Sequence, residues 1–205
     1  MLSVIRTNAL RSSAPLKPFS TTAFLSTNRK STPDKSRPDV HYYAADDNQA
    51  GSKKYPVSFL SDKELPSGSA IEDFPRAVIG WSASEGDINP GTFAENEEFA
   101  DLLHKVIGDN VDKVDDSSLK GMAEWQQEGW LHVADERNPP PWGRIPLPED
   151  IFGSVLLSKG IIQPNTYQRM PSHRFVTSNG LFQLSPPMQS ILRSTLLEEI
   201  KQSKK

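Results

Sequence analysis

The chain has no cysteine among its 205 residues. Without thiolates it cannot form disulfide bonds, cysteine-ligated zinc or iron–sulfur sites, or a cysteine nucleophile. It also lacks any apolar run of about 18 residues, which excludes a membrane-spanning helix. The phosphate-binding patterns GxxxxGK[ST] and GxGxxG are missing as well, so the common nucleotide-binding loops are excluded.

Metal-binding and hydrolytic motifs are incomplete. No two of the four histidines stand four residues apart, and no HExxH pattern occurs. The segment Gly80-Trp81-Ser82-Ala83-Ser84 has serine where the nucleophile elbow of serine hydrolases needs its second glycine. We therefore assign no catalytic residue, no metal site and no cofactor from the sequence.

Acidic residues are absent from Met1 to Pro33, a stretch rich in Ser, Thr, Ala and Leu. Its basic residues are Arg6, Arg11, Lys17, Arg29 and Lys30. This composition is typical of a mitochondrial import signal. The segment 17–22 resembles the two-step processing pattern of such precursors, which places the mature start near Thr27. We expect a presequence over 1–26 and localisation in the matrix, because the oxidative import route of the intermembrane space depends on paired cysteines.

Residues 27–70 are rich in Pro, Gly, Ser, Asp and Lys and have few apolar residues to bury, so the sequence predicts a disordered linker there. Residues 71–201 then form the predicted single α+β domain. Its first half contains a predicted helix pair. Thr92 and Glu95 fit a capping box before an apolar helical repeat that Gly108 ends. The second helix of the pair starts near Asp116, contains Trp125 on its apolar stripe and ends at Gly129.

The second half predicts strands. Trp130 to Asp135 alternates with period two. Two hairpins follow, one turning at Ser158-Lys159-Gly160 and one at Ser178-Asn179-Gly180, where Asn-Gly favours positive φ at both central positions. Ser185 precedes a closing amphipathic helix with two prolines in its first turn. The predicted fold is thus a small antiparallel sheet of two hairpins plus one strand, preceded by the helix pair.

Residues 130–153 combine five prolines, two tryptophans, two arginines and four carboxylates. Prolines lower the entropy cost of ordering a loop, and a rigid loop with Arg and Trp is typical of a binding surface. The alternative is structural: Asp135 or Glu136 pairs with Arg137 or Arg144, and Trp142 fills the edge of the core. His173 shares a strand face with Phe175, which predicts a hydrogen-bonded histidine at the edge of the core.

The second half also resembles an uncharacterised mitochondrial protein family of fungi. The resemblance covers roughly residues 130–195. The segments that carry it are His132 to Asn138, Pro141-Trp142-Gly143-Arg144, Pro148-Glu149-Asp150-Ile151 and Thr166-Tyr167-Gln168. It implies a mitochondrial location and carries over no activity, cofactor or catalytic residue.

Three functions stay open. The first is a soluble matrix accessory or assembly protein that binds a protein partner in a mitochondrial complex. The candidate binding residues are Arg137, Trp142, Arg144, Asp150, Tyr167, Arg169 and Arg174. The second is a small hydrolase or lyase that uses Asp135, Glu136 or Asp150 with Arg137 or Arg144 on an anionic substrate.

The third function is contact with RNA or the mitochondrial ribosome. Residues 160–205 contain six basic and only two acidic residues, so a basic face with aromatic residues could meet RNA, an acidic partner or a membrane surface. RNA is the weakest of the three candidates, because the whole chain has a net charge of −3.

Overall fold

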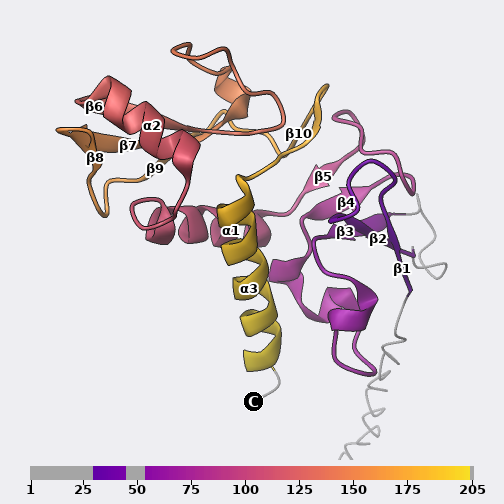
Figure 1. Ribbon diagram of the computed structural model, residues 1–205. Coiled ribbons are helices and arrows are strands. Elements are labelled where there is room, and N and C mark those ends of the chain that lie inside the picture. The colour runs from indigo at the N-terminus through magenta and orange to yellow at the C-terminus, as the bar shows by residue number, and fades with distance from the viewer. Residues whose placement is uncertain (1–29, 45–53, 204–205) are drawn as a thin grey trace, which may run out of the picture.

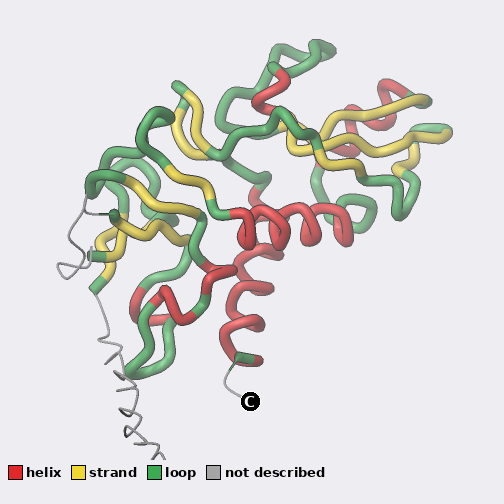
Figure 2. The backbone as a smooth tube through the Cα atoms, turned by 180° about the vertical axis from the view of Figure 1, so that it is seen from behind, coloured by secondary structure: helices red, strands yellow, loops and turns green. Residues whose placement is uncertain are grey.

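The computed structural model describes residues 30–44 and 54–203. The expected presequence at 1–26 lies outside these ranges, as does the expected mature start. Two groups of strands lie at opposite ends of the molecule, with helix α1 (Glu97–Asn110) between them and helix α3 (Pro186–Gln202) crossing α1 (Figures 1 and 2). The predicted α+β class is confirmed.

The first strand group is a five-stranded antiparallel sheet, in the order β1-β2-β3-β4-β5. Its strands are β1 (Ser31–Pro33), β2 (His41–Tyr43), β3 (Tyr55–Ser58), β4 (Gly80–Ser82) and β5 (Ala94–Glu95). Three short 3-10 helices, 62–64, 71–73 and 75–77, connect β3 to β4. The predicted linker at 27–70 is therefore wrong over the described residues 30–44 and 54–70, and the folded domain begins well before residue 71.

The physical reason is a local turn combined with strand partners that are more distant in sequence. Asp34 accepts hydrogen bonds from the backbone N–H groups of Ser36 and Arg37, both at 2.8 Å, which forms a turn and lets β1 pair with β2. Tyr42 and Tyr43 are then buried, and the Tyr43 hydroxyl donates to the Leu60 carbonyl at 2.9 Å. Few apolar residues suffice because β3 and β4 complete the sheet around them.

The helix pair is present with shifted ends. Asn96 caps α1, and its side chain accepts from Glu98 N–H at 3.1 Å, so the predicted Thr92–Glu95 capping box is wrong. Residues 94–95 instead form β5. The helix also continues two residues past Gly108. Helix α2 (Ser117–Gln126) begins at the predicted cap Asp116, whose side chain accepts from Leu119 N–H at 3.0 Å.

The second strand group contains the predicted strand and first hairpin. Strand β6 (Gly129–Ala134) pairs with β7 (Ile151–Ser158), and β7 pairs with β8 (Ile161–Ile162) and β9 (Gln168–Arg169), all antiparallel. The turn residues Lys159 and Gly160 have φ of 52° and 73°, the pattern of a type I′ hairpin. This pattern had been expected at the second hairpin.

The second hairpin, β10 (Val176–Thr177) and β11 (Gly180–Leu181), is present but forms a separate two-stranded sheet. Thr177 pairs with Gly180, so the turn consists of Ser178 and Asn179. Gly180 follows the turn with φ of 93°, and Asn179 keeps a negative φ. The turn therefore lies one residue earlier than predicted, and Asn179 and Gly180 are not its central pair.

An aromatic cluster joins the two strand groups. Phe182 contacts Phe59 with ring centroids 5.6 Å apart, Phe152 at 5.9 Å and Phe175 at 5.1 Å. Phe99 of α1 contacts Phe175 at 5.7 Å. The core is thus shared by both sheets, α1 and the β10–β11 hairpin.

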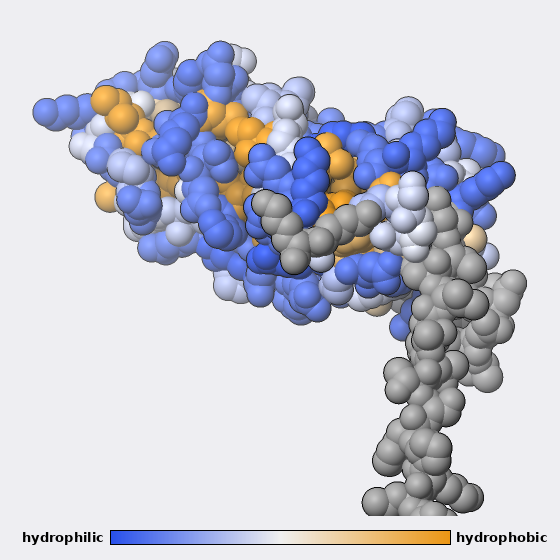
Figure 3. Space-filling view, turned by 90° about the horizontal axis from the view of Figure 1, so that it is seen from below, coloured by the Kyte–Doolittle hydropathy of each residue, from blue (hydrophilic) through white to orange (hydrophobic). Residues whose placement is uncertain are grey.

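Some hydrophobic residues also reach the surface. In the view from below they form patches separated by hydrophilic residues (Figure 3).

We expect Gly153→Ala to disrupt the pairing of β7 with β9. A Cβ at residue 153 would lie 2.4 Å from the Gln168 carbonyl oxygen and 2.5 Å from the Tyr167 ring. Such overpacking costs about 1–3 kcal/mol, measurable by urea unfolding. Gly91→Ala is the control, since its Cβ would meet only the Asn89 side chain at 3.4 Å. Equal stabilities of the two variants would contradict this packing.

Candidate functional site

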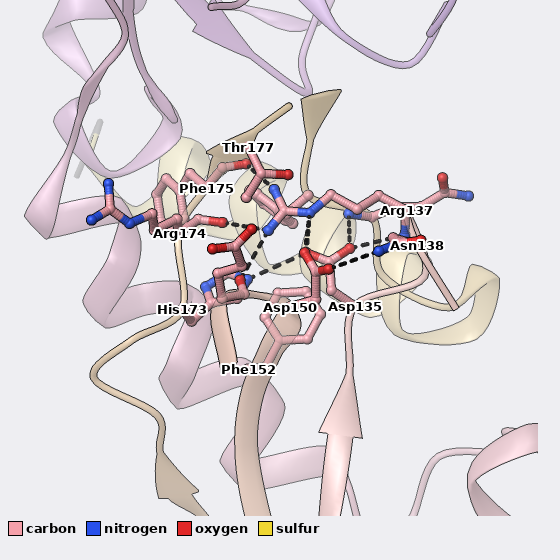
Figure 4. Close-up of polar contacts among 12 residues, drawn as sticks. Asp135, Arg137, Asn138, Asp150, Phe152, His173, Arg174, Phe175 and Thr177 are labelled. Carbon is pink, nitrogen blue, oxygen red and sulfur yellow. Dashed lines mark hydrogen bonds and ion pairs between the residues drawn. The ribbon is translucent and has the colours of Figure 1, made fainter. Parts of the chain in front are cut away.

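The guanidinium group of Arg137 is buried in the turn that follows β6. The Arg137 side chain is 2% exposed, and its Nε donates to Asp150 Oδ1 at 2.9 Å (Figure 4). The other four N–H groups donate to backbone carbonyls at 2.8–3.1 Å, those of Glu149, Arg174, Phe175 and Gly180. All five N–H donors of the group are therefore satisfied. We name Arg137, Asp135, Asp150 and His173 the Arg137 hub.

Asp135 completes the hub. Its Oδ1 accepts from the backbone N–H groups of Arg137 at 3.0 Å and Gln183 at 2.9 Å. Its Oδ2 lies 3.3 Å from both Arg137 Nε and His173 Nε2. Asp135 and Asp150 are fully buried. The hub thus ties the ends of β6 and β7 to the β10–β11 hairpin.

The sequence leaves two roles open for Arg137 and Asp150, contact with a partner or a structural ion pair, and the hub supports the structural role. Their side chains are buried and engaged, so they position the loop between them and do not face a partner. Pairing of Asp135 with Arg137, the structural alternative, is confirmed. His173 is hydrogen-bonded at the edge of the aromatic cluster, 4.4 Å from Phe152 between ring centroids, as predicted.

The candidate binding residues in the region 167–174 also differ in burial. Tyr167 is half-buried, hydrogen-bonded through its hydroxyl to His104 Nδ1 at 2.8 Å and to the Phe152 carbonyl at 3.1 Å. Burial raises the pKa of Tyr167 and lowers that of His104 to about 3, so this pair is uncharged near neutral pH. Arg169 is exposed and lies 3.3 Å from Asp101 of α1. Arg174 is exposed and contributes its carbonyl to the hub.

Arg144 and Trp142 instead border a cavity of about 340 Å³, which we name the Trp cleft. Its walls are α2, strand β6 and the loop 139–146. Leu119 and Met122 of α2, with Leu131 and Val133 of β6, give it an apolar floor. An open apolar cavity with a few polar groups is the usual form of a binding site.

Two tryptophans border the cleft and are exposed, Trp125 at 58% and Trp142 at 64%. Each ring lies against a glycine of the opposite wall. A Cβ at Gly121 would lie 3.5 Å from the Trp142 ring, and one at Gly143 would lie 3.6 Å from the Trp125 ring. The predictions that Trp142 fills the core edge and that Trp125 lies on a buried stripe are therefore wrong.

The loop conformation that presents Trp142 follows from its sequence. The Arg144 N–H donates to the Pro141 carbonyl at 3.0 Å, and Gly143 has φ of 74°. This is the geometry of a type II turn, in which the third residue needs positive φ and is usually glycine. The prolines before it restrict φ and limit alternative conformations. The turn holds Trp142 over α2.

Glu136 is the cleft's distinctive polar group. Its carboxylate forms no hydrogen bond or ion pair with the residues that the structure describes. Its backbone N–H donates to the Gln183 backbone carbonyl at 2.8 Å. Burial, then the charges of Asp116 and Asp135, raise the pKa of Glu136 above its ordinary value. The chain turns directly after β6, at residues 136 and 137, and Asp135 Oδ1 accepts the Arg137 N–H across this turn. In this turn the Asp135 and Arg137 side chains enter the hub, and Glu136 lines the cleft.

The sequence had singled out Trp142, Arg144 and Glu136, and the structure brings all three to the cleft. It had missed Trp125 as a surface residue, and it had not considered the exposed residues Ile145 and Leu147. The available signal was the spacing of tryptophans on either side of a proline-rich loop. That signal does not distinguish a buried ring from an exposed one.

We expect Arg137→Met to lower the free energy of unfolding by about 3–5 kcal/mol, because two buried carboxylates would lose their cation. Arg137→Lys keeps the charge but leaves carbonyls unpaired, and we expect a loss of about 2 kcal/mol. Urea unfolding measures both. Arg144→Met, at an exposed position of the same loop, should change stability by less than about 0.5 kcal/mol. A tolerated Arg137→Met would contradict the hub's structural role.

We expect Glu136→Gln to raise the melting temperature at about pH 7. The folded-state pKa of Glu136 is raised, so its favourable contribution is complete below the ordinary value of 4.5 and is lost as pH rises through the folded value. The variant and the wild type should therefore converge at about pH 4. Thermal melts at both pH values check this, and a difference that does not vary with pH would contradict it.

No described helix is long and apolar enough to cross a membrane, and the described residues contain no cluster of three or more His, Cys, Asp or Glu that could hold a metal ion. Comparisons with protein-family models, curated proteins and solved structures find no match to this chain.

Proposed function

We propose that the protein is a mitochondrial matrix accessory or assembly factor that binds a protein partner through the Trp cleft and the loop around it. The observation that carries this proposal is the exposure of Trp142, Trp125 and Ile145 on one rigid cavity rim; Ile145 is 74% exposed. Tryptophan is the residue most enriched among energetically dominant interface contacts. Clustered exposed apolar residues of this kind mark interaction sites.

The neighbouring charges support binding over hydrolysis. A hydrolase or lyase would need two carboxylates converging on a substrate. Asp135 and Asp150 are instead buried and engaged by Arg137 and by backbone N–H groups. Of the three candidate carboxylates Asp135, Glu136 and Asp150, Glu136 is the one without a hydrogen-bond or ion-pair partner among the described residues. The mitochondrial location is supported by the acid-free, arginine-containing stretch at the start of the chain.

Site-specific photo-crosslinking in intact mitochondria tests the partner surface. With benzoylphenylalanine at position 142, we expect a discrete crosslinked product with another protein. The matched control carries the same group at Ser190, an exposed position on α3. No product at 142, or the same products at both positions, would contradict a partner at the cleft.

Truncation of the rim gives a second test. Trp142→Ala and Ile145→Ser should each reduce partner recovery from mitochondria at least about tenfold, since loss of a dominant interface residue costs 2 kcal/mol or more. Both side chains are mainly exposed, so the melting temperature should change little. Folded variants that retain full recovery would overturn the proposal.

A further inference from the structure

Glu136 is a half-buried carboxylate without a cation. The nearby acidic groups are Asp116, which caps α2, and Asp135 of the hub. Arg137 neutralises Asp135 and has no free donor left for Glu136. An unpaired charge in a partly apolar cavity is unfavourable, and it becomes favourable when a cation binds beside it.

The other groups around Glu136 restrict the class of ligand that the cleft can bind. The His132 ring lines the cleft and is hydrogen-bonded through Nδ1 to Ser154 at 2.8 Å. Arg144 lies exposed on the loop side, and its side chain forms no hydrogen bond or ion pair with the described residues. Asp116 contributes a second negative charge. Anionic ligands would thus meet Asp116 and Glu136, and a positive group inserted between the walls would meet both.

The tryptophans favour the same ligand. Trp125 and Trp142 stand on opposite walls, and indole faces attract cations, above all the planar guanidinium of arginine. The floor of Leu119, Met122 and Leu131 accepts the apolar stem of a long side chain or apolar neighbours. A cation attached to an apolar body satisfies the rim, the floor and Glu136 together.

We propose that the partner inserts an arginine side chain, flanked by apolar residues, into the Trp cleft, with Glu136 as the acceptor of its positive charge. The inference rests on the proposed function, because it names the partner's chemistry at the same surface. Ile145 lines the cavity of about 340 Å³ and is mainly exposed, and the exposed Leu147 follows two residues later in the same loop. A peptide segment covers such a rim, whereas a free small cation would leave it in water.

The charge requirement is testable with a matched pair of probes on the full-length protein. We expect n-hexylguanidinium to shift the indole N–H resonances of Trp125 and Trp142 in an NMR titration. The neutral n-hexylurea, of nearly the same shape, should bind at least about fivefold more weakly. Glu136→Gln should abolish this preference, and Glu124→Gln, an exposed position of α2 outside the cleft, should keep it. Equal binding of both probes to the wild type, or no binding, would overturn the inference.

The pH dependence supplies an independent readout. Binding of the cation needs ionised Glu136, so the affinity for n-hexylguanidinium should fall as pH is lowered through the raised pKa of Glu136. Asp116, Asp135 and His132 also lie around the cleft, and all three are present in both the wild type and the Gln variant. The difference between the two proteins therefore isolates Glu136. A parallel decline in both would count against Glu136 as the acceptor.

Partner recovery separates this inference from the proposed function. If Glu136→Gln and Trp142→Ala both reduce recovery of the partner from mitochondria, the proposed function and the arginine contact are both supported. If Trp142→Ala reduces it and Glu136→Gln does not, the partner surface stands and the arginine contact is wrong. If neither variant reduces it, both proposals fail.

Discussion

The bond between the Arg137 guanidinium and the buried Asp150 carboxylate is the constraint on which the C-terminal half of the molecule depends. Buried ion pairs are weak evidence for stability in general, because desolvation offsets the attraction. Here the guanidinium also donates to four backbone carbonyls from two separate segments, so few alternative arrangements could satisfy it. The hub therefore specifies how the β10–β11 hairpin lies against β6 and β7.

The aromatic cluster extends that constraint to the N-terminal sheet. Phe182 follows β11 and contacts Phe59, which follows β3. Glu95 of β5 accepts a hydrogen bond from Phe175 N–H at 2.8 Å, beside the carbonyl that receives Arg137. Residues of the N-terminal sheet and of the C-terminal hairpin region thus meet at one place. A local change at the hub acts on a core that both sheets share.

Patterns local in sequence predicted much of this fold. Strand β6, the first hairpin, the Asp116 cap and the closing helix follow from side-chain periodicity and short-range hydrogen bonds. The N-terminal sheet was missed because its strands have two to four residues and pair with strands that no local pattern identifies, as where Tyr55 pairs with Ser82. Proline and glycine content signals a lack of local order, and it does not report distant strand pairing.

The candidate site shows the same limit. Composition pointed to residues 130–153, and it could not assign Arg137 to the interior and Trp142 to the surface. That assignment depends on the turn after β6, where Asp135 and Arg137 enter the hub and Glu136 does not. The partners that hold this turn, Asp150 and the carbonyls of residues 174–180, are distant in sequence, so composition does not reveal them.

The hub links the stability of the fold to the proposed binding site. It fixes the two ends of the loop that carries Trp142, and the turn at Gly143 fixes its tip, so little conformational freedom would remain to be lost when the proposed partner binds. Glu136, which stands between Asp135 and Arg137 in the sequence, lies at the cleft without a counter-charge among the described residues, and its burial disfavours the ionised carboxylate. In the proposed complex the partner's arginine would supply the cation that the packing of the described chain does not.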